Sequence, residues 1–155
     1  MQLFLPTLIL RHRRENLKKC SLRGLQREDF VFLTYPQDTL PHLISYCLLT
    51  LNAPPLTPED RSYGLLLIDG TWRYTQTMYQ EQIEKPERKV ALRSLPAHYQ
   101  TAYPRRQPDC PDPARGLSSL EALFLAYHIL KRPTHGILDN YYWKNVFLKK
   151  NQITE

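Results

Sequence analysis

The sequence predicts an α/β protein with a mainly parallel sheet and helices on both faces of that sheet. Residues 65–68 are four consecutive aliphatic residues without a polar face, which is typical of a central strand covered on both sides. Residues 117–133 instead repeat their apolar side chains at helical spacing. Segments of these two kinds alternate along the 155 residues, as they do in parallel sheets connected by helices, and the length suits one domain.

The first part of the chain contains two predicted strands and one predicted helix. Residues 7–10 indicate a short buried strand, and residues 30–35 indicate a second strand. Residues 40–51 have a mixed apolar character, which predicts a helix that begins near Pro41. The proline-rich residues 52–60 then predict a connector over the surface.

The middle of the chain continues this alternation. The central strand at residues 65–68 is followed by a predicted helix that begins near Thr71 and is closed by Pro86. Residues 89–95 are another candidate strand. Residues 96–116 contain five prolines, which exclude regular structure throughout, and long ordered loops of this kind are often functional.

A strong helical signal follows this loop. Ser118 and Glu121 have the spacing of a capping box, in which each side chain binds the backbone N–H of the other residue. Pro133 stops this helix, and residues 138–152 predict a final amphipathic helix that is basic at its end. One face of the helix before Pro133 contains the apolar side chains of Leu120, Leu123, Phe124, Tyr127 and Leu130.

Composition limits the classes of function. The net charge of +6 favours a polyanionic partner such as nucleic acid. The three cysteines lack the spacing of a disulfide framework or a zinc knuckle and favour a reducing cytosol, and the five histidines show no metal-ligand spacing, so no metal is predicted. No apolar stretch approaches the roughly 20 residues of a membrane span. The opening residues lack the basic leader and cleavage site of a signal peptide.

The first candidate site is the sequence Asp69-Gly70-Thr71-Trp72 at the end of the predicted central strand. Ligands of open parallel sheets collect beyond the carboxyl ends of the strands, and the following helix offers backbone N–H groups there. Gly70 suits a tight turn, and Trp72 adds an aromatic face. A simpler interpretation makes Asp69 a helix cap and Trp72 a core residue, and the spacing alone leaves both interpretations open.

The second candidate site is the entry into the helix after the proline-rich loop, with the sequence ARGLSSLEA. Gly116 permits the close approach of a ligand, and Ser118 and Ser119 offer hydroxyls at a helix N-terminus. Glu121 is explained by the capping box, so it is not a catalytic candidate.

Two basic regions are candidates for phosphate contact. In the proline-rich loop, Arg105 and Arg106 lie near Tyr99 and Tyr103, and this mixture of charge and rings suits a splayed RNA base. A run after the first strand can grip phosphates, although a solvated face is the commoner role of such a run. The basic residues of that run are Arg11, Arg13, Arg14, Lys18, Lys19 and Arg23.

Together these stretches resemble the DTW-domain family of aminocarboxypropyltransferases. The family's acid-x-Thr-Trp motif is matched by Asp69-Gly70-Thr71-Trp72. The stretch LILRHRRENLKKCSLRGL is similar to the family's basic strand-loop, in which a hydroxyl residue follows the basic run. RSLPAHYQTAYPRRQPDCPDPARGLSSLEA is similar to the family's second half, so the resemblance runs from about Leu8 to Leu130. Many DTW proteins carry an N-terminal cysteine cluster, which this sequence lacks.

The resemblance implies a SPOUT-like fold with a C-terminal trefoil knot. The single domain would then consist of an N-terminal lobe at about residues 1–60 and a cofactor-binding lobe at about residues 61–155. The implied activity is transfer of the 3-amino-3-carboxypropyl group of S-adenosylmethionine to a ring nitrogen of uridine in tRNA, in the cytoplasm, with release of methylthioadenosine. A sister branch modifies rRNA. A SPOUT-type RNA methyltransferase and a non-catalytic RNA-binding module remain as alternatives.

The resemblance also implies roles for individual residues. Trp72 would hold the sulfonium by cation–π attraction, and Asp69 would orient the donor, attract the sulfonium or accept the uridine proton. Ser21 matches the hydroxyl after the basic run and would bind the carboxylate of the arm. The implied donor site consists of Ser21, Leu67, Ile68, Asp69, Trp72, Leu92, Leu95, Gly116, Leu117, Ser118 and Ser119. The implied RNA contacts are Arg13, Lys18, Lys19, Arg105 and Arg106.

Overall fold

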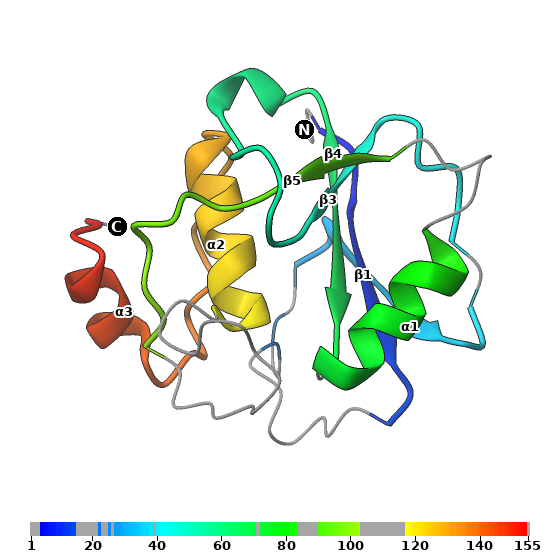
Figure 1. Ribbon diagram of the computed structural model, residues 1–155. Coiled ribbons are helices and arrows are strands. Elements are labelled where there is room, and N and C mark those ends of the chain that lie inside the picture. The colour runs from blue at the N-terminus through cyan, green and yellow to red at the C-terminus, as the bar shows by residue number, and fades with distance from the viewer. Residues whose placement is uncertain are drawn as a thin grey trace.

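The structure, a computed structural model, describes residues 4–14, 22, 25, 27–38, 40–70, 72–83, 90–102 and 117–154. They form a five-stranded parallel sheet with the strand order β2-β1-β4-β3-β5. Helix α1 lies on one face of this sheet, and helices α2 and α3 lie on the other (Figure 1). The predicted α/β class with helices on both faces is confirmed. The strands are β1 (Thr7–His12), β2 (Phe30–Tyr35), β3 (Tyr46–Leu49), β4 (Gly64–Asp69) and β5 (Ala91–Arg93), and the helices are η1 (Pro58–Asp60), α1 (Trp72–Gln82), α2 (Ser119–Ile129) and α3 (Lys144–Lys150).

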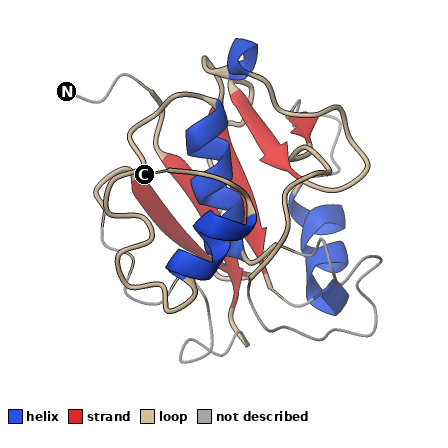
Figure 2. Cartoon of the chain, turned by 90° about the vertical axis from the view of Figure 1, so that its left-hand side faces the viewer, coloured by secondary structure: helices blue, strands red, loops and turns tan. Residues whose placement is uncertain are grey.

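The central strand β4 shows why the sheet needs helices on both sides. Leu65 and Leu67 belong to the hydrophobic core under α2, whereas Leu66 belongs to the core under α1. Side chains of a strand point alternately to opposite faces, so an uninterrupted aliphatic strand is stable only between two covering layers. Figure 2 shows one of these layers, with α2 lying across the strands.

The helix predicted for residues 40–51 is wrong, because residues 46–49 form strand β3. This strand pairs with β4 on one side and β5 on the other, so its backbone groups bond to two neighbours. Its side chains alternate strictly, with Tyr46 and Leu48 in the core under α1 and Cys47 and Leu49 in the core under α2. Position inside the sheet therefore overrides the weak helical character of this segment.

The other predicted elements are confirmed with changed bounds. Strand β1 extends to His12, and β2 has the predicted bounds. Strand β5 is shorter than residues 89–95, and α1 ends at Gln82, while Pro86 lies outside the described residues. Helix α3 is shorter than predicted because turns precede it, in which the N–H of Tyr141 donates to the carbonyl of Leu138.

A glycine is required at the start of β4. A Cβ at Gly64 would lie 2.5–2.7 Å from three atoms of the Tyr46 ring. The ring is buried and its hydroxyl donates to the carbonyl oxygen of Pro6 at 2.8 Å, so it is not able to move aside easily. We expect Gly64→Ala to lower the free energy of unfolding by about 1–3 kcal/mol, as overpacking of a core does.

Urea denaturation measures this effect, and Gly70→Ala is the matched control. A Cβ at Gly70 would make ordinary contacts of 3.6–3.7 Å with His12, Thr75 and Met78. If both variants unfold at the wild-type urea concentration, the packing of Tyr46 does not require a glycine at position 64.

The sequence also predicts no membrane span, no disulfide framework and a C-terminal knot. Within the described ranges, no helix is long and apolar enough to cross a membrane. Cys47 is a free buried thiol, and its burial, followed by the charge of Asp60, raises its pKa to about 11. Cys20 and Cys110 lie outside the described residues. Residues 103–116 also lie outside them, and the C-terminal knot stays a prediction.

Candidate functional site

The strand order places a topological switch point between the carboxyl ends of β1 and β4. From β1 the chain passes to β2 on one side, and from β4 it passes over β3 to β5 on the other side. In open parallel sheets, ligands bind where the connections diverge in this way. Arg11 and Asp69 are register partners at the carboxyl ends of these two strands. The topology therefore selects the same edge of the sheet as the Asp69-Gly70-Thr71-Trp72 motif.

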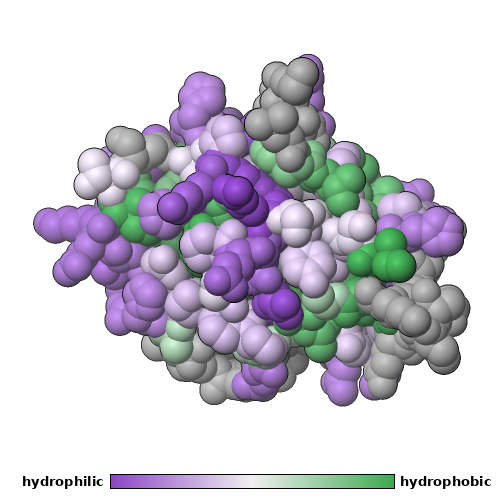
Figure 3. All heavy atoms as spheres, turned by 90° about the horizontal axis from the view of Figure 1, so that it is seen from above, coloured by the Kyte–Doolittle hydropathy of each residue, from purple (hydrophilic) through white to green (hydrophobic). Residues whose placement is uncertain are grey.

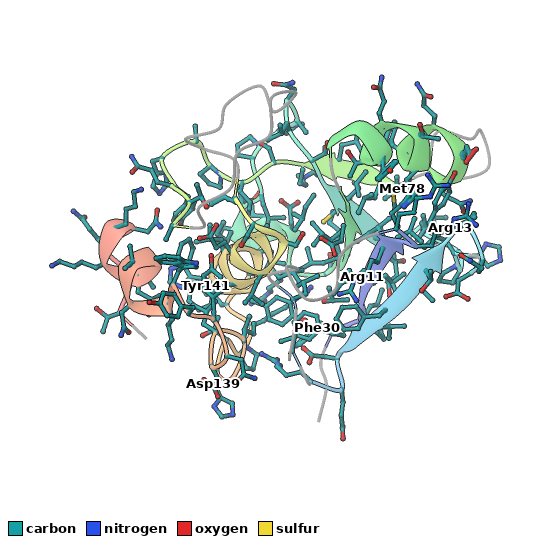
Figure 4. All side chains as sticks on the ribbon, turned by 90° about the horizontal axis from the view of Figure 1, so that it is seen from below. Arg11, Arg13, Phe30, Met78, Asp139 and Tyr141 are labelled. Carbon is teal, nitrogen blue, oxygen red and sulfur yellow. The ribbon has the colours of Figure 1, made fainter. Side chains whose placement is uncertain are left out.

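Asp69 joins three segments of the chain at this edge. Its carboxylate is 94% buried, Oδ2 accepts a hydrogen bond from Arg11 Nε at 3.3 Å, and Oδ1 accepts one from Ser119 Oγ at 2.5 Å. Arg11 belongs to β1, and Ser119 is the first residue of α2. Figure 4, which looks onto the carboxyl edge, shows Arg11 between α2 and the end of β1. Asp69 thus does more than the helix cap of the simpler interpretation, because it binds the adjacent strand and the second helix.

Arg11 is the residue of this site that sequence analysis misses. It appears there as one member of a basic run, although it is the direct partner of Asp69. Its guanidinium carbon also lies 4.8 Å above the centre of the Phe32 ring. A signal for it exists in the sequence, since Arg11 and Asp69 each follow a run of aliphatic residues on a buried strand. Only the register between the strands shows that the two side chains meet.

The two serines at the start of α2 have different environments. Ser118 is buried, and its hydroxyl accepts the N–H of Glu121 at 3.2 Å, while Glu121 accepts the N–H of Ser118 at 2.8 Å. The predicted capping box is confirmed. The hydroxyl of Ser118 is therefore engaged inside the helix cap, and Ser119 is the serine that reaches Asp69.

Glu121 has a larger structural role than its cap. This side chain is completely buried, and besides Ser118 it accepts hydrogen bonds from Thr101 Oγ1 at 2.6 Å, from the N–H of Ala102 at 2.8 Å and from the Tyr141 hydroxyl at 2.9 Å. It therefore attaches the loop that follows β5 and the turn before α3 to the N-terminus of α2.

The apolar residues predicted for the donor site do not all lie on one side of the sheet. Leu67, Leu95 and Leu117 pack with the core under α2. Ile68 and Leu92 pack with the core under α1. Neighbouring residues of one strand point to opposite faces, so the predicted set does not line a single wall.

On the α1 side of the same edge, aromatic side chains cover the ends of the strands. The rings of His12 and Tyr74 are stacked, with centroids 4.0 Å apart and planes 8° apart. Burial, followed by the charges of Arg13 and Arg14, lowers the pKa of His12. The positive charge exposed beyond β1 therefore comes from the arginines.

No cluster of His, Cys, Asp and Glu within the described ranges has the geometry of a metal site.

The opposite, amino-terminal side of the sheet is seen in Figure 3, where hydrophilic residues cross the middle of the surface between separate hydrophobic areas. The edge of the sheet at Asp69 is thus the place where a topological switch point, a partly buried charge pair and a helix N-terminus coincide.

No family model matches the sequence, and no curated protein matches it. Among solved structures, the chain is similar to the SAM-dependent rRNA:acp-transferase Tsr3 from Vulcanisaeta distributa. The TM-score is 0.68 at 23% sequence identity, and the match covers 96% of this chain and 80% of the Tsr3 chain. The chain has the fold of Tsr3. This likeness confirms the predicted SPOUT-like fold.

The structure places only some of the remaining residues predicted for the site. Trp72 is the first residue of α1, and its side chain is not among those described. Arg13 is exposed just beyond β1, and Figure 4 shows it at the end of the strands. The other predicted site residues lie outside the described ranges, namely Ser21, Gly116, Lys18, Lys19, Arg105 and Arg106.

Proposed function

We propose that this protein transfers the 3-amino-3-carboxypropyl group of S-adenosylmethionine to a ring nitrogen of uridine in RNA. The main support for this proposal is the partly buried Arg11–Asp69–Ser119 junction at the topological switch point of the sheet. It contains the acid of the motif from which the family resemblance was drawn. The shared fold of Tsr3, which is named as a SAM-dependent rRNA:acp-transferase, supports the same class of reaction.

The described residues fit the chemical groups of this donor. Its amino acid arm ends in a carboxylate, and its reacting centre is a sulfonium. Helix α1 begins three residues after Asp69, and the first residue of α2 binds Asp69, so the N-termini of two helices on opposite faces of the sheet lie at this edge. The positive ends of helix dipoles attract carboxylates, so this edge suits the carboxylate of the arm. Trp72 at the start of α1 would face the sulfonium by cation–π attraction.

The chemistry requires selection among three carbons bound to sulfur. A bond forms between the uridine nitrogen and the γ-carbon of the arm, the bond from that carbon to sulfur breaks, and sulfur keeps the electron pair in methylthioadenosine. The proton of the uridine nitrogen leaves to a base or to water. Methyl transfer is the competing reaction, so the protein must align the γ-carbon with the attacking nitrogen, and such positioning accounts for several kcal/mol of a barrier.

Asp69 acts in this scheme by orientation. Its two oxygens already accept hydrogen bonds from Arg11 and Ser119, and it is buried. Arg11 at 3.3 Å also balances its charge, so the pair exerts little net attraction on a sulfonium. The function that remains is to hold the end of β1, the end of β4 and the N-terminus of α2 in one geometry around the donor.

Two kinds of RNA are candidates for the substrate that accepts the arm. The resemblance to the DTW-domain family implies uridine in tRNA, in the cytoplasm, and this is the substrate we propose. The name of Tsr3 favours rRNA as the second candidate. Both agree with the net charge of +6.

Two preparations of labelled S-adenosylmethionine test the reaction with purified protein and bulk tRNA. One is labelled in the methyl group, and the other in the carboxyl of the arm. We expect label in the RNA only from the carboxyl preparation. Label only from the methyl preparation would replace this function by methyl transfer, and rRNA in place of tRNA tests the second candidate. A folded protein that binds RNA but transfers neither label would leave the binding module as the function.

Replacement of Trp72 tests the proposed donor site. We expect Trp72→Ala to abolish measurable binding of S-adenosylmethionine while the protein stays folded, because the variant lacks the ring that we propose to face the sulfonium. Isothermal titration calorimetry measures the affinity, and circular dichroism reports the fold. Trp143, which is half-buried beside the exposed Tyr142 ring, provides the matched control Trp143→Ala. Equal donor affinity in the two folded variants would place the donor elsewhere.

A further inference from the structure

The carboxyl edge carries an exposed aromatic ring next to the Asp69 junction. Phe32 lies on β2, which is an edge strand of the sheet, and is 38% exposed. It shares a face with Phe30, which packs in the core under α2, because the two are separated by one residue along the strand. Phe32 therefore lies on the same face of the sheet as Arg11 and Asp69.

Contacts connect this ring to the junction in a row. Asp69 binds Arg11 Nε at 3.3 Å, and the guanidinium carbon of Arg11 lies 4.8 Å above the Phe32 ring. The row runs from the N-terminus of α2 across β4 and β1 to the outer strand β2.

Cationic side chains lie at and beyond the end of the neighbouring strand β1. Arg13 and Arg14 are exposed immediately after β1, and Arg11 covers part of the ring. An exposed phenyl ring with arginines beside it matches single-stranded RNA, in which an unpaired base stacks on an aromatic ring and arginines contact the phosphates. An apolar protein partner does not require arginines beside the phenyl ring.

We propose that Phe32, together with the guanidinium of Arg11, is the platform on which an unpaired base of the RNA substrate stacks. The inference rests on the proposed function, because it places the RNA on the β2 side of the donor site. The base next to the modified uridine, or the uridine itself, then lies against Phe32 while Arg13 and Arg14 bind the backbone. Phe32 is a positioning residue for the substrate.

The test compares two neighbouring residues with the same exposure. Val31 is 37% exposed and points to the other face of β2, so Val31→Ala is the matched control for Phe32→Ala. The dissociation constant of a short fluorescein-labelled, uridine-rich single-stranded RNA is measured by fluorescence anisotropy at several salt concentrations. Loss of a base–aromatic stack is expected to weaken binding at least about fivefold in Phe32→Ala, while Phe32→Tyr and Val31→Ala stay near wild type.

The salt dependence separates stacking from charge. Phe32→Ala removes no charge, so its plot of affinity against salt keeps the wild-type slope, whereas Arg13→Ala is expected to reduce the slope by about 0.7. If Phe32→Ala does not fold, Phe32→Leu replaces it, since leucine keeps an apolar side chain but has no ring for stacking. The weaker affinity is expected there as well.

Several results would overturn the platform. It is overturned if the wild type does not bind the RNA, or if folded Phe32→Ala and Val31→Ala bind it equally. A wild type that forms dimers dispersed by Phe32→Ala, with unchanged RNA affinity, would assign the ring to a second copy of the chain. Failure of the proposed function has a different signature, namely a wild type whose RNA binding depends on Phe32 but which transfers no carboxyl label.

Discussion

Replacement of Glu121 by alanine is expected to lower the free energy of unfolding by about 4 kcal/mol or more. The buried carboxylate accepts four hydrogen bonds, from Ser118, Thr101, Ala102 and Tyr141. Each buried donor left without a partner costs about 1–3 kcal/mol, and a domain of this size is stabilised by only about 5–15 kcal/mol. Glu121→Ala is therefore expected to be close to the limit of folding.

Milder variants keep this prediction measurable. Glu121→Gln preserves the volume and one acceptor oxygen but turns an N–H group toward donors, so a loss of about 2 kcal/mol is expected. Tyr141→Phe removes the hydroxyl that donates to Glu121, with an expected loss of about 1 kcal/mol. Urea midpoints measure both, and Glu59→Gln on the exposed surface of η1 is the control. A Glu121→Gln protein as stable as Glu59→Gln would show that the four contacts do not hold the loop.

Asp69→Asn is expected to reduce kcat/KM for transfer of the arm at least about 100-fold, a loss of about 2.7 kcal/mol of transition-state stabilisation. The asparagine oxygen still accepts from Ser119, but its amide N–H groups face the donor Arg11. Arg11 then lacks its counter-charge in a half-buried position, so the side-chain link between the ends of β1 and β4 is lost while the link to Ser119 remains. Transfer of carboxyl label to RNA measures the rate.

The control is an ion pair on the surface. Asp139 lies 3.8 Å from Lys144 and its side chain is 63% exposed, so Asp139→Asn is expected to leave activity unchanged and stability within about 0.5 kcal/mol. Figure 4 shows Asp139 well away from Arg11. Equal activity of the Asp69→Asn and Asp139→Asn proteins would remove the junction from the mechanism.

The pH dependence of the remaining activity separates the two roles of Asp69. If Asp69 orients its partners, Asp69→Asn lowers kcat at every pH and leaves the shape of the profile unchanged. If Asp69 accepts the uridine proton, the variant loses the acidic limb of the profile. The engagement of both carboxylate oxygens supports the first outcome.

The sequence by itself determined those elements whose signal is local. The aliphatic run of β4 and the apolar period of α2 place both elements, because burial on two faces or on one helical face leaves a direct imprint on residue order. The capping box of Ser118 and Glu121 is also local, since its two residues are three positions apart. Asp69 is also found from a local signal, because it directly follows the aliphatic run of β4.

Only the tertiary structure decided what depends on contacts between distant segments. The segment at 46–49 is a strand because it is inserted between β4 and β5, and its four residues are too few to show that from their own pattern. Arg11 and Asp69 meet through the register of two strands 58 positions apart, and Thr101 and Ala102 meet Glu121 through the return of a loop. The position of Phe32 beside that pair likewise follows from the strand order. Register and strand order arise when the whole core is assembled, so residue types alone do not encode them in any short window.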